Sequence, residues 1–262
     1  MTQHGILNRS DFGRLSVMDF LQRIDDTLEK TFDSGDKEIR TWFLVRQNTL
    51  PFVLCCSYAL FCTVIGPAMM KNRKPFNLRM PMILFNAFLV VAYSISLFTI
   101  LFNLPQVSYS DFCKGSAVKK GTLTYKLTSC CWVLYILKYI EFIDTIFFIL
   151  RKKMNSVTFL HVVHHTVVPI LGWIMLRTET SGFQSIPVMI NGFVHIIMYA
   201  YYGLSAIGPK MRPYLWWKKY LTVFQMVKSD ISFFVFITYR STTINVTQII
   251  LPLSLFENFN KM

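Results

Sequence analysis

The chain has 262 residues, of which 53% are hydrophobic and 16% are charged, and its mean hydropathy is +0.42. So few charged residues cannot cover the surface of a soluble domain of this length, which excludes an ordinary soluble globular protein. A formal net charge of +13 would indicate nucleic-acid binding in a soluble chain. Here much of the basic excess lies in short segments between apolar runs, where it sets membrane topology instead.

Residues 1–48 are predicted to form an amphipathic segment on the lumenal side of the membrane. Charges are spread through this segment, and it contains neither the apolar core nor the cleavage site of a signal peptide, so we expect the first span to act as an uncleaved anchor. Apolar residues recur at helical spacing at Val17, Phe20, Leu21, Ile24, Leu28 and Phe32. This pattern predicts a short helix that lies on the membrane surface or packs against the spans.

Six apolar runs follow, each near the ~20 residues that a helix needs to cross a bilayer. They are Thr49–Ala68, Pro81–Phe102, Leu127–Leu150, Val157–Leu176, Ile186–Ile207 and Trp217–Thr238. In lipid the backbone must satisfy its own hydrogen bonds, and runs of this length do so as helices. We therefore expect an all-α integral membrane protein with six clear transmembrane helices, a catalytic domain over residues 49–240, and a short atypical segment at 241–262.

Basic residues are concentrated after the first, third and fifth spans, which predicts that these loops are cytosolic and that the N-terminus is lumenal. The residues of this set are Lys71, Arg73, Lys74, Arg79, Arg151, Lys152, Lys153, Lys210, Arg212, Lys218 and Lys219.

Ionisable and amide side chains inside the spans are costly in lipid, so they indicate a functional site. The third span holds Lys138, Glu141, Asp144 and Thr145; the fourth holds His161, His164 and His165; the fifth holds Asn191, His195, Tyr199 and Tyr202; and the sixth holds Gln225. The three histidines of the fourth span share one broad helical face because they are three and four residues apart. The depths of these groups in their spans predict that they converge on one chamber open to the cytosol.

Several interpretations of this cluster are compatible with the residues alone. Di-iron oxygenases share the His-x-x-His-His pattern but use more histidines than this chain offers, whereas a single zinc ion remains compatible with the ligand types. His195 fits a helix–helix hydrogen bond, Lys138 and Glu141 fit a structural ion pair, and the tyrosines fit interface anchors. A cysteine nucleophile is disfavoured because no cysteine falls in the cluster. A metal-free imidazole that attacks a thioester, with a second one moving protons, is the chemistry that we favour.

Three ordered motifs resemble the signature of the very-long-chain fatty acid elongase family, in particular its branch for saturated and monounsaturated chains. They are Lys138-Tyr-Ile-Glu141-Phe-Ile-Asp144-Thr145, His161-Val-Val-His164-His165 and His195-Ile-Ile-Met198-Tyr199-Ala-Tyr201-Tyr202. The resemblance extends from about Trp42 to Gln225. It implies seven transmembrane helices, six of them ringed around an acyl tunnel with the first span outside. It also implies the condensation of acyl-CoA with malonyl-CoA to 3-oxoacyl-CoA, CO2 and CoA in the endoplasmic reticulum membrane.

The resemblance also implies roles for individual residues. His164 would be the acyl-accepting nucleophile, His195 would face it, Asn191 would polarise a carbonyl, and Glu141 and Asp144 would orient His161 and His165. Substrate binding would fall to Lys138, Tyr199, Tyr202, Gln225 and, at the cytosolic rim, Lys152, Lys153, Lys218 and Lys219. No metal or other cofactor is expected. The expected partners are the two CoA substrates, membrane lipid, the downstream 3-oxoacyl-CoA reductase, dehydratase and enoyl reductase, and a second copy of the chain, with no nucleic acid.

The chain departs from the family pattern near its end. Lys228 stands where the family usually has a second glutamine after Gln225, and Ile244–Phe259 is short and polar for a final span. Cys113 also lacks the second lumenal cysteine that the family pairs with it. These departures lead us to expect an incomplete seventh span and low activity. They keep open a catalytically inactive elongase-like protein or a lipid-binding scaffold.

Overall fold

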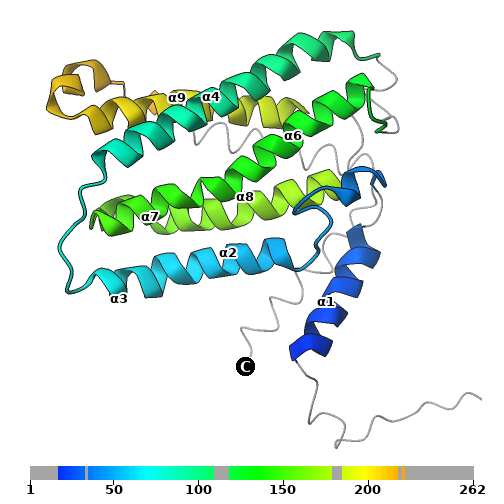
Figure 1. The fold of residues 1–262 in the computed structure, drawn as a ribbon, viewed down its shortest axis with the longest axis horizontal. Helices are drawn as coiled ribbons and strands as arrows, with labels where there is room; N and C mark the ends of the chain where they lie inside the picture. The colour runs from blue at the N-terminus through cyan, green and yellow to red at the C-terminus, as the bar shows by residue number, and fades with distance from the viewer. Residues whose placement is uncertain (1–16, 33–34, 109–117, 179–184, 218–219, 222–262) are drawn as a thin grey trace, which may run out of the picture. The chain divides into compact units, whose positions relative to one another are not determined.

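The computed structural model describes residues 17–32, 35–108, 118–178, 185–217 and 220–221, and within these ranges it contains helices and no strands (Figure 1). The α-helices are α1 (Val17–Phe32), α2 (Leu50–Leu60), α3 (Gly66–Met70), α4 (Arg79–Asn103), α6 (Leu123–Ile140), α7 (Phe142–Leu150), α8 (Phe159–Thr178) and α9 (Ser185–Ile207). The short 3₁₀ helix η7 (Pro209–Leu215) follows α9. The predicted all-α class is confirmed for the described part of the chain.

Four helical segments in the described ranges are long and apolar enough to cross a membrane. They are Leu50–Met70, Arg79–Gln106, Phe159–Thr178 and Ser185–Ile207, and each coincides with one of the predicted spans. The predicted sixth span, Trp217–Thr238, lies almost entirely outside the described residues, as does the segment 241–262. Four such helices make this a multi-pass membrane protein.

The third predicted span does not form one regular helix. The predicted span Leu127–Leu150 consists of two helices, because α6 ends at Ile140 and α7 begins at Phe142. At the junction the Asp144 N–H donates to the Glu141 carbonyl, three residues back, at 3.0 Å. This tighter turn interrupts the regular α-helical pattern. The interruption falls at Glu141, one of the predicted site residues.

The first membrane helix contains a turn of π-helix. The segment Phe61–Ile65 joins α2 to α3 with this wider geometry, and Pro67 follows in the first turn of α3. Proline has no N–H to donate to the carbonyl four residues earlier, and its ring crowds that carbonyl. A π-turn before Pro67 relieves both constraints. The helix therefore continues across the membrane in spite of its proline.

The described residues fall into two compact units. Within the described ranges, one unit draws on residues 17–32, 35–77, 118–125 and 135–178, and the other on residues 78–108, 126–134, 185–217 and 220–221. In the first unit α2 packs along α8, and α3 packs on α7. In the second unit α4 packs along α9.

The predicted amphipathic N-terminal helix is present as α1, and it packs against the first unit's membrane helices. The Phe32 ring meets the Trp173 ring of α8 edge-on, with 5.6 Å between the centroids. The segment that follows is anchored on the same end of α8, because the Trp173 indole N–H donates to the Gln47 carbonyl at 3.1 Å and Arg177 donates to the Val45 carbonyl at 3.3 Å. The contact with α8 is consistent with packing against the spans, one of the two predicted positions.

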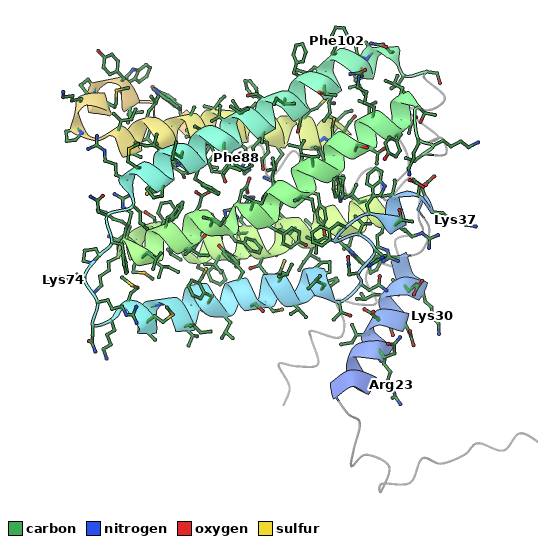
Figure 2. The ribbon with its side chains drawn as sticks, in the orientation of Figure 1. Arg23, Lys30, Lys37, Lys74, Phe88 and Phe102 are labelled. Atoms are coloured by element: carbon green, nitrogen blue, oxygen red, sulfur yellow. The ribbon has the colours of Figure 1, made fainter. Side chains whose placement is uncertain are left out.

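In the second unit, α4 presents one apolar face outward and buries the other. Phe88 and Phe102, both labelled in Figure 2, lie on the outward face and are more than half exposed. The opposite face carries Asn86, Leu89 and Tyr93, which are fully buried or nearly so. In a membrane helix an exposed apolar face is the lipid-facing one. The buried face of α4 therefore carries its polar groups toward α9.

Candidate active site

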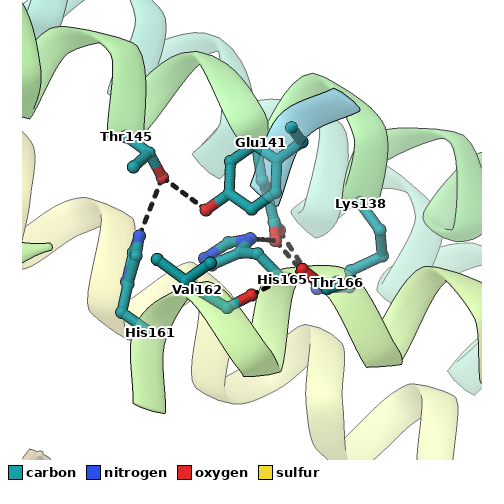
Figure 3. Close-up of polar contacts among 8 residues, drawn as sticks. Lys138, Glu141, Thr145, His161, Val162, His165 and Thr166 are labelled. Atoms are coloured by element: carbon teal, nitrogen blue, oxygen red, sulfur yellow. Dashed lines mark hydrogen bonds and ion pairs between the residues drawn. The ribbon is translucent and has the colours of Figure 1, made fainter. Parts of the chain in front are cut away.

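The first unit brings the polar residues of the third and fourth predicted spans together. Lys138 lies in the last turn of α6, Glu141 at the junction, and Thr145 in the first turns of α7. They face His161 and His165 of α8, as the close-up in Figure 3 shows. The predicted meeting of these two helices is therefore observed.

Glu141 is the most deeply buried carboxylate of this cluster, with no exposed surface. The Lys138 ammonium lies 3.0 and 3.3 Å from its two oxygens, and Nδ1 of His165 lies 3.9 Å from Oε2 (Figure 3). The predicted ion pair is present, and the same carboxylate also lies beside the His165 ring.

His161 is held by a different partner. Its Nε2 lies 2.8 Å from Oγ1 of Thr145, which is fully buried (Figure 3). The same oxygen lies 2.8 Å from the hydroxyl of Tyr58 on α2. Thr145 stands in the first motif, but sequence reasoning assigned it no role, and it missed Tyr58 altogether. A single hydroxyl within an apolar run gives no indication of the helix that it faces.

The imidazole rings form one continuous group along α8. The ring centroids of His161 and His165 are 4.5 Å apart, and those of His164 and His165 are 5.6 Å apart. His165 is buried, whereas His161 and His164 are partly accessible. The predicted shared face is confirmed. His164 therefore shares partial accessibility with His161.

The second unit holds the other predicted histidine. His195 of α9 is buried, and its ring stacks on Tyr93 of α4 at 5.2 Å with 24° between the planes. Tyr199 lies one turn further along α9 and stacks on the same Tyr93 ring at 6.1 Å, while Tyr202 meets Tyr199 edge-on at 6.3 Å. Asn191 is partly buried one turn before His195. Tyr93 is the second site residue that sequence reasoning missed.

The single chamber that would join both groups of histidines remains a prediction, since each group belongs to its own unit. Lys152 and Lys153 are exposed in the turn after α7, and the Lys152 ammonium donates to the Lys71 carbonyl at 3.1 Å. Gln225, Lys218 and Lys219 lie outside the described residues. The part of the chain that the structure describes contains no group of three His, Cys, Asp or Glu side chains arranged to hold a metal ion. Metal-free chemistry stays a prediction.

Comparison with known proteins identifies the family. The family model for ELO, the GNS1/SUR4 family, matches residues 43–258, a range that continues beyond Gln225. The chain is 35% identical over 214 residues to very long chain fatty acid elongase 7 of Rattus norvegicus, which covers 82% of this chain and 76% of the relative.

Two further relatives carry the same type of name. Identity to very long chain fatty acid elongase 4 of Homo sapiens is 35% over 213 residues, covering 80% of this chain and 67% of the relative. Identity to very long chain fatty acid elongase 1 of Mus musculus is 38% over 194 residues, covering 74% of this chain and 70% of the relative. The chain belongs to the ELO family, whose GNS1/SUR4 model matches most of its length.

Proposed function

We propose that this very-long-chain fatty acid elongase condenses an acyl-CoA with malonyl-CoA at the histidine group of α8, giving 3-oxoacyl-CoA, CO2 and CoA. The observation that carries the proposal is the contiguous group of three imidazoles on α8, of which His161 contacts the buried Thr145 and His165 lies beside the buried Glu141. An inactive elongase-like protein or a lipid scaffold is not favoured, because the relatives are named as elongases.

The proposed reaction has two stages. A neutral imidazole nitrogen of His164 attacks the thioester carbonyl, so that a C–N bond forms and the C–S bond breaks. The acyl-imidazolium keeps its ring proton, and CoA leaves as a thiolate that takes up a proton from water. Malonyl-CoA then loses CO2, and the resulting enolate carbon attacks the acyl group. A C–C bond forms, the C–N bond breaks, and the neutral imidazole of His164 is restored. His195 and Asn191 would support the carbonyl oxygens, where charge develops.

The finer architecture belongs to the same proposal. We place seven transmembrane helices in the endoplasmic reticulum membrane, six of them around an acyl tunnel, with the active site open to the cytosol. CoA phosphates need cationic partners, and Lys152 and Lys153 are exposed in the turn where the thioester would enter. The reductases and the dehydratase that complete elongation would be separate proteins.

A condensation assay on expressed membranes, with labelled malonyl-CoA and a panel of acyl-CoAs, tests the proposal. His164→Ala should abolish product while the protein still accumulates in the membrane. Thr166→Val is the matched control, because its hydroxyl donates to the backbone of its own helix at 2.8 Å and should leave turnover intact. Acyl-CoA alone should release CoA and leave the acyl group on the wild-type protein. Release of CoA only when malonyl-CoA is present would contradict the covalent stage.

A further inference from the structure

The first membrane helix, which the family resemblance places outside the catalytic ring, reaches the histidine group through Tyr58. Tyr58 is 5% exposed, and its ring stacks on Phe142 of α7 at 4.1 Å with 18° between the planes. The stack aims its hydroxyl at Thr145, 2.8 Å away, and Thr145 is in turn 2.8 Å from Nε2 of His161. Tyr58 packs in a buried cluster with Cys62 of the π-turn and with Ile149 and Val162.

The hydrogen bonds that link Tyr58, Thr145 and His161 can be donated in either of two directions, and each direction requires a different tautomer of His161. In the first, Tyr58 donates to Thr145 and Thr145 donates to Nε2, so the ring proton of His161 is on Nδ1. In the second, Nε2–H of His161 donates to Thr145, Thr145 donates to Tyr58, and the phenolic proton needs another acceptor. The neighbouring Cys62 thiol is a weak acceptor.

The first direction is favoured because Tyr58, the stronger donor, donates its proton and the imidazole nitrogen, the better acceptor, accepts at the other end. A phenol is more acidic than an aliphatic hydroxyl, and an imidazole nitrogen is a better acceptor than either oxygen. Aligned hydrogen bonds of this kind also strengthen one another in an interior that excludes water.

We propose that Tyr58 is a positioning residue, the first donor in a chain Tyr58–Thr145–His161 that holds His161 as the neutral tautomer protonated on Nδ1. In this state the Nε2 lone pair is occupied by Thr145 and the Nδ1 lone pair is absent. His161 therefore has no free lone pair with which to attack a thioester. This inference rests on the proposed function, and it removes His161 from the candidates for the nucleophile while assigning it the role of an oriented N–H donor.

Imidazole ¹⁵N spectroscopy on the full-length protein tests the tautomer directly. The chain has five histidines, so the His161 signals can be assigned by their loss in His161→Asn. Wild-type protein should show an unprotonated Nε2 and a protonated Nδ1, and Tyr58→Phe and Thr145→Val should each produce a mixture of tautomers. A protonated Nε2 in the wild type would overturn the proposal. This readout does not depend on turnover, so it remains informative if the proposed condensation fails.

Kinetics separate positioning from mere support of the fold. Tyr58→Phe should lower kcat for condensation about three- to tenfold, the effect of one hydrogen bond of ordinary net strength, without changing KM for acyl-CoA. Thr145→Ser, which keeps the hydroxyl, should retain most of the turnover. Tyr135→Phe is the control for loss of a buried phenol, since Tyr135 donates to the Leu44 carbonyl at 3.1 Å, and it should leave kcat unchanged.

The double variant gives the sharpest distinction. Thr145→Val alone leaves the buried Tyr58 hydroxyl without its partner, which costs stability, and adding Tyr58→Phe removes that orphaned group. The double variant should therefore recover thermal stability but keep the low kcat and the mixed tautomers. If the double variant recovered kcat together with stability, Tyr58 would have a structural role only, and the proposal would be overturned.

Discussion

Nδ1 of His165 lies 3.9 Å from Oε2 of Glu141, the carboxylate that the Lys138 ammonium also contacts. The buried Glu141 carboxylate, at the junction between α6 and α7, thus contacts Lys138 and also lies beside His165. Removal of the carboxylate would affect both, because a lone ammonium in a buried site has lost its compensating charge.

The first prediction concerns this ion pair. Glu141→Ala should lower the free energy of unfolding in detergent by about 3–5 kcal/mol, because it removes the buried carboxylate that contacts the Lys138 ammonium. Thermal unfolding of the purified protein measures the loss. The control is Glu38→Gln, since Glu38 pairs at 4.0 Å with an exposed Lys120, a surface pair whose removal should cost no more than about 1 kcal/mol. Equal losses in the two variants would contradict a special role for the buried pair.

A second prediction concerns the aromatic support of His195. Tyr93→Leu should lower stability by about 1–3 kcal/mol and reduce condensation, because the stacked ring is lost from a fully buried position. Tyr93→Phe keeps the ring and should retain the stacking. On the lipid-facing side of α4, Phe88→Leu should change stability by no more than about 0.5 kcal/mol. Full activity in Tyr93→Leu would exclude this ring as a support for His195.

A third prediction concerns the exposed lysines after α7. Replacing Lys152 and Lys153 by Gln should raise KM for both CoA substrates, and added salt should reduce the difference from wild type, since exposed charges are screened. Lys37→Gln, in the predicted lumenal segment, is the matched change of charge and should leave both KM values unaltered. Unchanged KM in the double variant would restrict these lysines to setting topology.

A fourth prediction concerns metal. Imidazole chemistry on a thioester needs no Lewis acid, so purified active protein should contain no stoichiometric transition metal. Elemental analysis of protein with measured turnover is the test. Activity that a chelator removes and one particular metal restores would overturn it.

The amino-acid sequence by itself determined the membrane class, four observed spans, α1 and the shared face of the α8 histidines. These features depend on local properties: run length sets a span, and a three- or four-residue interval places side chains on one helical face. The ordered motifs likewise identified the family before any contact was known.

Only the tertiary structure decided which side chains hold the histidines. Tyr58 and Tyr93 lie in helices that are apolar almost all round, so no periodic pattern marks the face that carries them inward. Their partners are 87 and about 100 residues away in the chain, and packing between helices selects them. The residues around Glu141 are compatible with a continuous helix, so the sequence does not show the break there. In the structure the tighter turn lies where the buried carboxylate is beside both Lys138 and His165.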